Sequence, residues 1–521
     1  MMFIKQDAEH GTTPTERHQF DDFRARIIIS LFCCRVNLLC TIDLPTIFLK
    51  RPMKFPMLIL LALLALAACD TESVDMPAPS AIPNHEFWLT TADKSVLFAK
   101  QTQAITISSS GIPVIDVDVF RTFQSMEGFG FTLTGGSAQV LFAMSAPARA
   151  AVLQELFATD GANIGISYLR ISIGASDLDE RVFSYNDLPA GETDTAMAQF
   201  SIAPDKTHLI PVLKEILAIN PSITILGSPW SAPVWMKTNG SSIGGSLRVQ
   251  YFAAYAKYFV KYIQAMQQEG ITVHAITVQN EPLHGGNNPS MVMQAAEQSL
   301  FVKNHLAPAF KANHIDTRII VYDHNADRTD YPLAIYADSA ARAVVDGAAF
   351  HLYGGSIHYL TAVHNAYPDK HLYFTEQWIG APGNFPGDLK WHTNNLTIGA
   401  TRNWCRVVLQ WNLAADPNQD PHTPGGCSEC LGALTVNGNT ITRNPAYYIV
   451  AHASKFVRPG SVRIHSGRTD WLNTVAFLSP DGKRVLIAIN NGSTAQAFYI
   501  REGITEIASL LAAGAVGTYL W

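Results

Sequence analysis

The sequence carries little charge and has no strongly basic stretch. Asp, Glu, Lys and Arg together make up 15% of its 521 residues, and the formal net charge is −6. No long run of Lys and Arg occurs. Because binding to nucleic acid depends on a concentrated positive surface, the sequence predicts no nucleic-acid partner. The expected substrate is neutral or weakly charged.

The sequence also lacks the short motifs that mark common cofactor sites and nucleophiles. Neither G-x-G-x-x-G nor G-x-x-x-x-G-K-[ST] follows a candidate strand, so a nucleotide cofactor is not indicated. The helical zinc motif H-E-x-x-H is absent as well, and the G-x-S-x-G pattern at 240–244, GSSIG, does not directly follow a candidate strand as a serine-presenting turn would. We therefore expect an activity that needs neither a cofactor nor a metal ion.

Cysteine is scarce, with seven in the chain. The pair Cys427 and Cys430 has C-x-x-C spacing, but no second pair lies nearby, so a structural zinc site is not expected. If the protein is exported, these two cysteines could form a small-loop disulfide. Cys405 is expected to be a buried free thiol.

An apolar run near the N-terminus is too short to span a membrane comfortably. Residues 55–68, FPMLILLALLALAA, follow Lys54 and end at small residues and Cys69, which is typical of a secretory signal. The sequence Leu-Ala-Ala-Cys resembles the lipobox of bacterial lipoproteins. That resemblance implies that Cys69 becomes a lipidated N-terminus. The protein would then be exported and anchored at the cell envelope, in the periplasm or on the cell surface, or otherwise secreted, with no other membrane contact.

On that interpretation Met53 is the true start of the protein. Residues 1–52 would be an upstream artefact, although a genuine extension is the alternative. Residues 70–83 are typical of a linker.

The middle of the chain alternates short apolar segments with helical or loop segments. The candidate strands are 128–133, 165–173, 223–228, 275–280, 318–323, 347–353, 372–376 and 407–412. In the clearest helix, 247–268, aromatic residues recur on one face at helical spacing. Eight such repeats predict an α/β fold, a (β/α)8 TIM barrel; without that count, a doubly wound sheet would be the choice.

Short strands at the two ends of the chain are expected to form one β-sandwich. Segments 95–99, 105–107 and 114–120 are strand-like, and residues 474–489 are typical of a hairpin that turns at Pro-Asp-Gly. The predicted organisation is 1–52 artefact, 53–69 signal peptide, 70–83 linker, 84–125 N-terminal sandwich strands, 126–440 catalytic barrel and 441–521 C-terminal part of the sandwich.

The residues at the carboxyl ends of the strands identify the candidate site, because the active sites of such barrels open on that face. They are Asp177, Pro229, Trp230, Asn280, Glu281, His324, His351, Tyr353, Glu376, Trp411 and Asn412. Two carboxylates among aromatic, imidazole and amide groups are suited to binding and cleaving a sugar. The alternatives are ion-paired or surface glutamates for Glu281 and Glu376, and a core histidine for His351.

Several longer motifs resemble glycoside hydrolase family 30, which contains glucosylceramidases and microbial endo-β-1,6-glucanases. They are GFG at 128–130, PWSAPVWMKTNG at 229–240, QNEP at 279–282, FTE at 374–376, WNLA at 411–414 and TYLW at 518–521. The resemblance runs from about residue 85 to Trp521.

The resemblance implies a retaining glycoside hydrolase with Glu281 as the general acid/base and Glu376 as the nucleophile. In such enzymes one carboxyl protonates the leaving oxygen while the other attacks the anomeric carbon. Asn280 is expected to bond the sugar 2-hydroxyl. The other expected substrate-binding residues are Asp177, Trp230 and Trp411 in the innermost subsite, His351, and Tyr353, which contacts the nucleophile.

Two departures bear on the substrate. Human-like glucosylceramidases carry a Trp where this chain has Leu352, and the segment 416–432 is similar to the microbial glucanases. The predicted substrate is therefore a β-1,6-glucan. The alternatives are a glucosylceramidase or broad β-glucosidase and, outside catalysis, a surface lipoprotein that only binds glycan.

Overall fold

The computed structural model describes residues 26–33, 36–43, 80–82, 84–102 and 111–521. The chain divides into two compact units, 1–77 and 78–521. In the first, strands β1 (Arg26–Cys33) and β2 (Val36–Asp43) pair antiparallel. The predicted signal run, Cys69 and the candidate strand 105–107 lie outside the described residues. Among the residues that are described, no helix combines the length and apolarity needed to cross a membrane.

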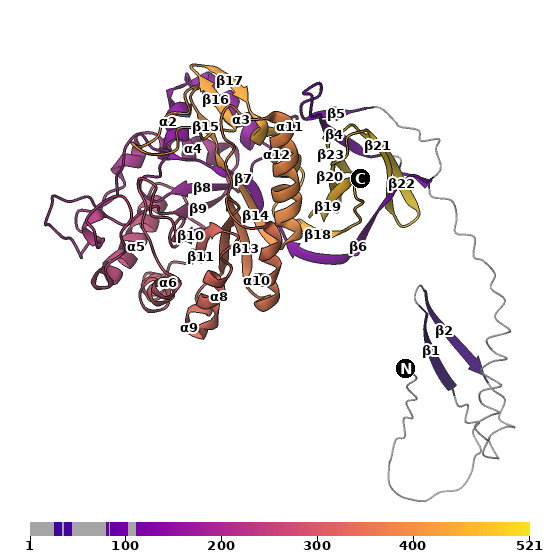
Figure 1. The fold of residues 1–521 in the computed structure, drawn as a ribbon, viewed down its shortest axis with the longest axis horizontal. Helices are drawn as coiled ribbons and strands as arrows, with labels where there is room; N and C mark the ends of the chain where they lie inside the picture. The colour runs from indigo at the N-terminus through magenta and orange to yellow at the C-terminus, as the bar shows by residue number, and fades with distance from the viewer. Residues whose placement is uncertain (1–25, 34–35, 44–79, 83, 103–110) are drawn as a thin grey trace, which may run out of the picture. The chain divides into compact units, whose positions relative to one another are not determined.

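The second unit contains a closed barrel of eight parallel strands (Figure 1). They are β7 (Gly128–Thr132), β8 (Tyr168–Ser172), β9 (Thr224–Ser228), β10 (Ala275–Thr277), β11 (Arg318–Asn325), β12 (Gly347–His351), β13 (His371–Glu376) and β14 (Cys405–Asn412). The strands follow chain order around the barrel, and β14 pairs with β7 to close it. The predicted barrel is confirmed. Strand β10 is shorter than expected, so Asn280 and Glu281 follow the strand rather than ending it.

Helices and loops connect the barrel strands. The α-helices of the barrel region are α2 (Gly135–Ala143), α3 (Ala146–Phe157), α4 (Leu209–Ile219), α5 (Phe252–Gln268), α6 (Ala295–Phe301), α7 (Ala307–Ala312), α8 (Asp330–Ala337), α9 (Ser339–Arg342), α10 (Leu360–Ala366) and α11 (Phe385–His392). Two π-helical segments, η5 (Val302–Leu306) and η7 (Thr393–Ala400), continue α6 and α11. The aromatic face of α5 is buried as predicted, but the helix begins at Phe252 because Val249–Tyr251 forms a 3-10 turn.

The barrel interior is apolar in its middle and ion-paired at its amino end. The inner layer consists of Tyr168, Leu226, Ala275, Ile320, Ala349, Tyr373, Val407 and Leu409. Beside it Arg318 donates two hydrogen bonds to Glu127, at 2.8 and 2.6 Å, so the charges at this half-buried end of the barrel compensate each other. The side chains that can carry out a reaction therefore lie at the carboxyl ends of the strands.

The two ends of the second unit form one ten-stranded sheet, in the order β3-β22-β21-β6-β18-β19-β20-β23-β4-β5. Its strands are β3 (Ser80–Ala81), β4 (Glu86–Thr90), β5 (Ala99–Gln101), β6 (Val114–Ser125), β18 (Val462–Ser466), β19 (Leu472–Leu478), β20 (Arg484–Asn490), β21 (Gln496–Glu502), β22 (Thr505–Leu511) and β23 (Val516–Leu520). Its two halves meet at β6 and enclose a separate apolar core that includes Ile115, Leu486 and Phe498. The predicted joining of the chain ends is confirmed, as is the hairpin of β19 and β20.

The prediction of a strand over 95–99 is wrong for most of its length. Residues before Ala99 form turns, in which the Asp93 side chain accepts hydrogen bonds from the backbone N–H and the hydroxyl of Ser95. Phe98 adopts a left-handed φ of 45°. Such side-chain bonds give the backbone an alternative to the ladder, and they outweigh the strand propensity of Val96 and Leu97.

Between barrel and sheet lie three short strands and a buried helix. Strands β15 (Ala414–Ala415), β16 (Leu434–Asn437) and β17 (Thr440–Arg443) form a small sheet after β14. Helix α12 (Pro445–Ser454) is buried along its length and contacts both β7 and β23. It therefore ties the barrel to the ten-stranded sheet.

Candidate active site

The two predicted catalytic glutamates lie at the carboxyl ends of two barrel strands, β10 and β13, which are separated by β11 and β12. Glu376 is the last residue of β13, and Glu281 follows β10. Glu281 has a left-handed φ of 45°, which costs free energy for a residue with a side chain. Its N–H donates to the carbonyl of Asp323 at 2.9 Å, and its carbonyl accepts from the N–H of His284 at 2.8 Å. These bonds hold the strained backbone and so fix where the Glu281 carboxyl points.

The two carboxyl groups are close together. An oxygen of Glu281, an oxygen of Glu376 and a ring nitrogen of His351 all lie within 4.8 Å of one another. Retaining glycosidases place their carboxyls about 5–5.5 Å apart, whereas inverting ones leave about 6.5–9.5 Å to admit a water. The spacing in this site therefore suits direct attack by one carboxylate on a sugar.

Both oxygens of Glu376 accept hydrogen bonds. Arg170 Nη1 donates to Oε2 at 2.5 Å, and the Tyr353 hydroxyl donates to Oε1 at 2.9 Å. Burial, together with the neighbouring charge of Glu281, raises the pKa of Glu376, and the positive charges of His351 and Arg170 act against that rise. The guanidinium and phenol thus hold Glu376 in one orientation, and the charge of the guanidinium limits the rise in its pKa.

Glu281 is paired with His351, which is fully buried. Nδ1 of His351 lies 3.2 Å from Oε1 of Glu281, and Nε2 lies 3.0 Å from Oδ1 of Asp323. Burial alone would lower the pKa of His351, but the charge of Glu376 and the bonds to Asp323 and Glu281 raise it to about 9. Burial by itself would raise the pKa of Glu281. The hydrogen bond to His351 and the charge of that imidazole act against burial, and the resulting pKa of Glu281 is lowered. The pair therefore holds one proton, which these shifts place on His351 in the free enzyme, 3.2 Å from the Glu281 oxygen that has to carry it during catalysis.

Two residues that sequence reasoning missed join these groups. Arg170, buried in β8, also donates to Asn280 Oδ1 at 2.6 Å and Asp323 Oδ2 at 2.9 Å. Asp323 also accepts from Thr277 at 2.7 Å and Thr375 at 2.6 Å. Burial would raise the pKa of Asp323, but Arg170 and His351 hold it well below its usual range.

A signal for both residues was present in the sequence. Arg170 is the one charge in the buried strand Tyr168–Ser172, where an unpaired charge would be very costly. Asp323 immediately precedes His324 at the end of a predicted strand, a position where an acidic residue can reach the site. A buried arginine implies a carboxylate partner, and the barrel supplies two.

The predicted sugar-binding aromatics form a compact group at the same end of the barrel. The rings of Trp230 and Trp411 lie 5.4 Å apart, and the Arg170 guanidinium lies 4.7 Å from the Trp230 ring centroid. Trp230 is only 1% exposed, so it supports the floor of the site more than it offers an open face. Tyr353 is 40% exposed and stands at the mouth.

Asp177 is buried beside the two glutamates. Burial, and then the charges of Glu376 and Glu281, raise its pKa to about 7. Near neutral pH it can therefore donate a proton to a hydroxyl as well as accept one, which suits a group that binds a sugar hydroxyl. The structure thus brings together the residues predicted to catalyse or to bind substrate within the described chain: Asp177, Trp230, Asn280, Glu281, His351, Tyr353, Glu376 and Trp411. Cys69 lies outside the described residues.

The segment 416–432 after β14 reaches across the barrel mouth. The N–H of Thr423 donates to the carbonyl of Asp177 at 2.9 Å, and Nδ2 of Asn288 donates to the carbonyl of Pro424 at 2.9 Å. Cys427 and Cys430, whose pairing the sequence left open, form a disulfide, which packs with Leu178, Trp230, Trp378 and Trp411. Cys405 is buried and free, as predicted. The segment therefore stiffens one wall of the site.

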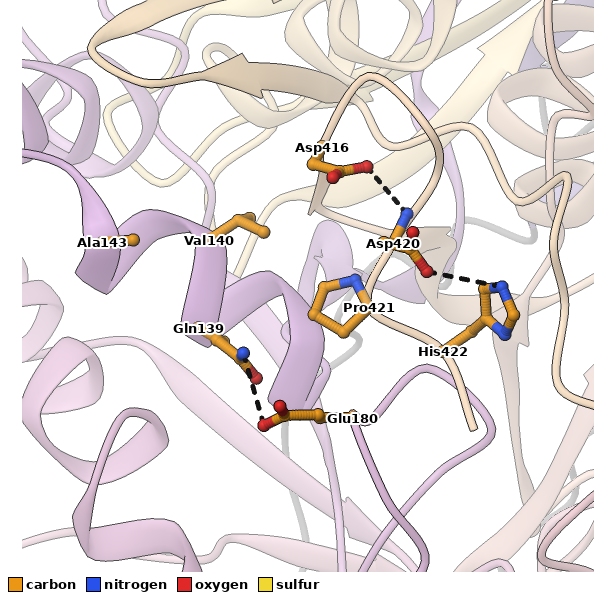
Figure 2. A pocket seen from close by; sticks show the side chains of 8 residues that line it. All are labelled: Gln139, Val140, Ala143, Glu180, Asp416, Asp420, Pro421 and His422. Carbon is orange, nitrogen blue, oxygen red and sulfur yellow. Dashed lines mark hydrogen bonds and ion pairs between the residues drawn. The ribbon is translucent and has the colours of Figure 1, made fainter. Parts of the chain in front are cut away.

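A hollow of about 390 Å³ lies between this segment and helix α2 (Figure 2). Its lining is Gln139, Val140, Ala143, Glu180, Asp416, Asp420, Pro421 and His422. The polar side chains pair with one another, Gln139 with Glu180 and Asp420 with His422. None of the predicted site residues lines it, so it lies beside the chemistry.

Glu281, His351 and Glu376 are also close enough to offer ligands to a metal ion. Both ring nitrogens of His351 already face carboxylates, and Glu376 already pairs with Arg170. A metal cation would have to compete with that guanidinium and displace the shared proton. The donor set fits proton transfer and nucleophilic attack better than metal binding.

Family models match most of the chain. Residues 126–457 match the glycosyl hydrolase family 30 TIM-barrel domain, and residues 460–519 match the glycosyl hydrolase family 30 beta sandwich domain.

Individual relatives agree with that match. An endo-1,6-beta-D-glucanase of Neurospora crassa is 36% identical over 387 residues, 70% of this chain and 79% of the relative. The solved endo-beta1,6-glucanase BT3312 is 36% identical, has a TM-score of 0.78, and is covered over 99% of its length by 84% of this chain. A lysosomal acid glucosylceramidase of Mus musculus is 28% identical over 433 residues, 77% of this chain and 82% of the relative.

Proposed function

Because the chain belongs to glycoside hydrolase family 30, we propose that Glu281 and Glu376 cleave a β-glucosidic bond in two displacement steps. The observation that carries the proposal is the pair of buried carboxyls within 4.8 Å, one held by Arg170 and Tyr353 and the other sharing a proton with His351. Purified protein should release glucose or gluco-oligosaccharide of β configuration, and nuclear magnetic resonance of the first product tests this.

In the first step the Glu376 carboxylate attacks the anomeric carbon of the bound sugar. The bond from that carbon to the leaving oxygen breaks, and Glu281 transfers a proton to the oxygen. The sugar is then esterified to Glu376. Arg170 and Tyr353 orient the attacking carboxylate, which reduces the entropy that must be lost to reach the transition state.

In the second step Glu281 takes a proton from water, and the water oxygen attacks the anomeric carbon. The ester bond to Glu376 breaks, the carboxylate returns, and the product keeps the β configuration. Throughout the cycle His351 balances the charge on Glu281, because its Nε2 is held by Asp323 while Nδ1 faces Glu281. His351 is thus a positioning residue more than a sugar contact.

The remaining predicted residues suit a subsite for one glucose unit. Asn280 Oδ1 is fixed by Arg170, which leaves the amide N–H groups of Asn280 free for a hydroxyl such as the sugar 2-hydroxyl. Asp177 lies near both glutamates, and the two tryptophans form the floor. Such contacts gain strength when the sugar approaches its transition state.

The substrate that fits best is a β-1,6-glucan. The relatives named endo-1,6-beta-D-glucanase are more similar to this chain than the glucosylceramidase is. The disulfide-stiffened segment 416–432 forms one wall of the site, and Leu352 is buried among core residues instead of presenting an apolar face to a lipid.

We predict that kcat/KM on pustulan-type β-1,6-glucan exceeds that on laminarin-type β-1,3-glucan and on detergent-dispersed glucosylceramide by about 10- to 200-fold. A difference of one or two good contacts, about 1–3 kcal/mol, is enough for that preference. The three substrates should be compared with one enzyme preparation by reducing-sugar and ceramide release. A higher value for glucosylceramide would refute the linkage assignment and leave the retaining mechanism in place.

We also propose that the mature protein is lipidated at Cys69, because an apolar run ending in Leu-Ala-Ala-Cys precedes the enzyme. A diacylglycerol plus an acyl chain would hold it stably at a membrane surface of the cell envelope. Mass spectrometry of detergent-extracted protein should show a mature N-terminus at Cys69 with added lipid mass, and Cys69→Ser should abolish the modification. An unmodified N-terminus upstream of residue 53 would contradict this.

A further inference from the structure

Two exposed tryptophans lie where the barrel meets the ten-stranded sheet, away from the candidate active site. Trp391 lies in the last turn of α11 and is 40% exposed, and Trp471 precedes β19 and is 55% exposed. Helix α11 follows β13 and, as in other barrels, runs back from the carboxyl end of the strand. Trp391 therefore lies on the barrel flank.

A rigid set of amides joins the two segments that carry these tryptophans. Asn394 Nδ2 donates to Asn491 Oδ1 at 2.7 Å, and Asn473 Nδ2 donates to Asn394 Oδ1 at 3.0 Å. The N–H of Asn491 donates to the carbonyl of Trp471 at 2.7 Å. The barrel and sheet are thus fixed to each other at this point, and both indoles are presented by an ordered frame.

Bonds next to each indole extend the frame. Lys390, the neighbour of Trp391, donates to the carbonyl of Asn491 at 3.0 Å, and Asn395 donates to the carbonyl of Trp391 at 2.9 Å. Gly492 lies against Trp471, since a Cβ at Gly492 would be 3.7 Å from the ring. We name the set Trp391, Asn394, Asn473, Trp471 and Asn491 the junction patch.

The patch has hydrogen-bonding capacity left over. The Asn491 side chain donates one N–H to Asn394 and accepts one bond from it, which leaves a second N–H and a lone pair. Asn491 is partly exposed. Aromatic faces stack on the C–H surfaces of sugar rings, and amides bond sugar hydroxyls, so the chemistry of this patch matches a neutral glycan.

We propose that the junction patch is a second glycan-binding site, which holds a distant stretch of the same β-glucan polymer that enters the active site. This rests on the proposed function, because the occupant is the polymeric substrate. A single exposed tryptophan would need no explanation, but two on one amide frame beside partly exposed amides are suited to stacking sugar units. Binding there raises the effective concentration of chain near the active site.

The test uses Trp391→Ala/Trp471→Ala, with Trp391→Phe/Trp471→Phe as its matched aromatic pair. In a Glu376→Gln background, affinity electrophoresis in pustulan-type β-1,6-glucan should show about tenfold weaker retention for the alanine pair and near wild-type retention for the phenylalanine pair. Phe120→Ala, at a 94% exposed aromatic elsewhere on the sheet, should leave retention unchanged.

The otherwise wild-type enzyme supplies the second measurement. The alanine pair should raise KM on long glucan about tenfold and leave kcat/KM on an aryl β-glucoside within twofold. Unchanged retention of the alanine pair on the polymer, or equal loss in the phenylalanine pair, would overturn the junction site. Failure of wild-type enzyme to hydrolyse any β-glucan or β-glucoside would instead overturn the proposed function, so the two failures are distinguishable.

Discussion

Replacing Glu376 by glycine is expected to lower kcat by at least about 10⁴-fold, because no other carboxylate is placed to attack the anomeric carbon. The substitution leaves Arg170 as a buried cation with a cavity beside it, where the Glu376 carboxylate used to pair. Azide is a small anion that can occupy this cavity. Added azide should therefore restore part of the turnover on an activated aryl β-glucoside, and the product should be the α-glucosyl azide.

The matched variant Glu376→Gln keeps the volume of the side chain and leaves azide no space. It should be equally inactive and should not respond to azide. The configuration of the azide product is measured by nuclear magnetic resonance. A β-glucosyl azide from Glu376→Gly would mean that Glu376 is the acid/base, and our assignment of the two roles would be reversed.

Replacing Glu281 is expected to slow the cleavage of substrates with basic leaving groups much more than the cleavage of substrates with acidic leaving groups. Glu281→Gln cannot donate the proton held by the Glu281–His351 pair, so hydrolysis of a natural glucan should fall about 10²- to 10⁴-fold. A dinitrophenyl glucoside needs little protonation, so its first step should stay near the wild-type rate. Its second step should slow, because no base activates water, and a glucosyl-enzyme should accumulate and be visible by mass spectrometry.

Glu281→Ala opens space for azide on the other face of the intermediate. Azide should accelerate turnover of the dinitrophenyl glucoside and give the β-glucosyl azide. The variant should also lose the fall in rate at high pH that deprotonation of the acid causes in the wild type. Equal losses on the natural glucan and the dinitrophenyl glucoside would contradict an acid/base role for Glu281.

The fold was predictable because its signals are local and repeated. Each barrel strand is a short apolar run, and eight of them separated by helical segments admit few arrangements. The joining of the two chain ends was also predictable, since exposed strand edges at both ends need partners. The segment 95–99 was mispredicted because hydrogen bonds of Asp93 and Ser95 override the propensity of the residues that follow.

The candidate site was partly predictable. Glu281 and Glu376 could be named because strand ends converge in a barrel and because their motifs resemble those of a known family. Arg170 was not named, since nothing local shows which strands meet around it. The role of His351 was open between packing and function until its two ring nitrogens were seen to face Asp323 and Glu281.

By itself the sequence determined the barrel, the sandwich built from both chain ends and the two carboxylates, because each depends on residue types at short range or on their repetition. Only the tertiary structure decided how a proton is shared between Glu281 and His351, how Arg170 links Glu376, Asn280 and Asp323, and where Trp391 and Trp471 stand. Electrostatic coupling and surface patches arise from distances between residues far apart in the chain, and those distances exist only after folding.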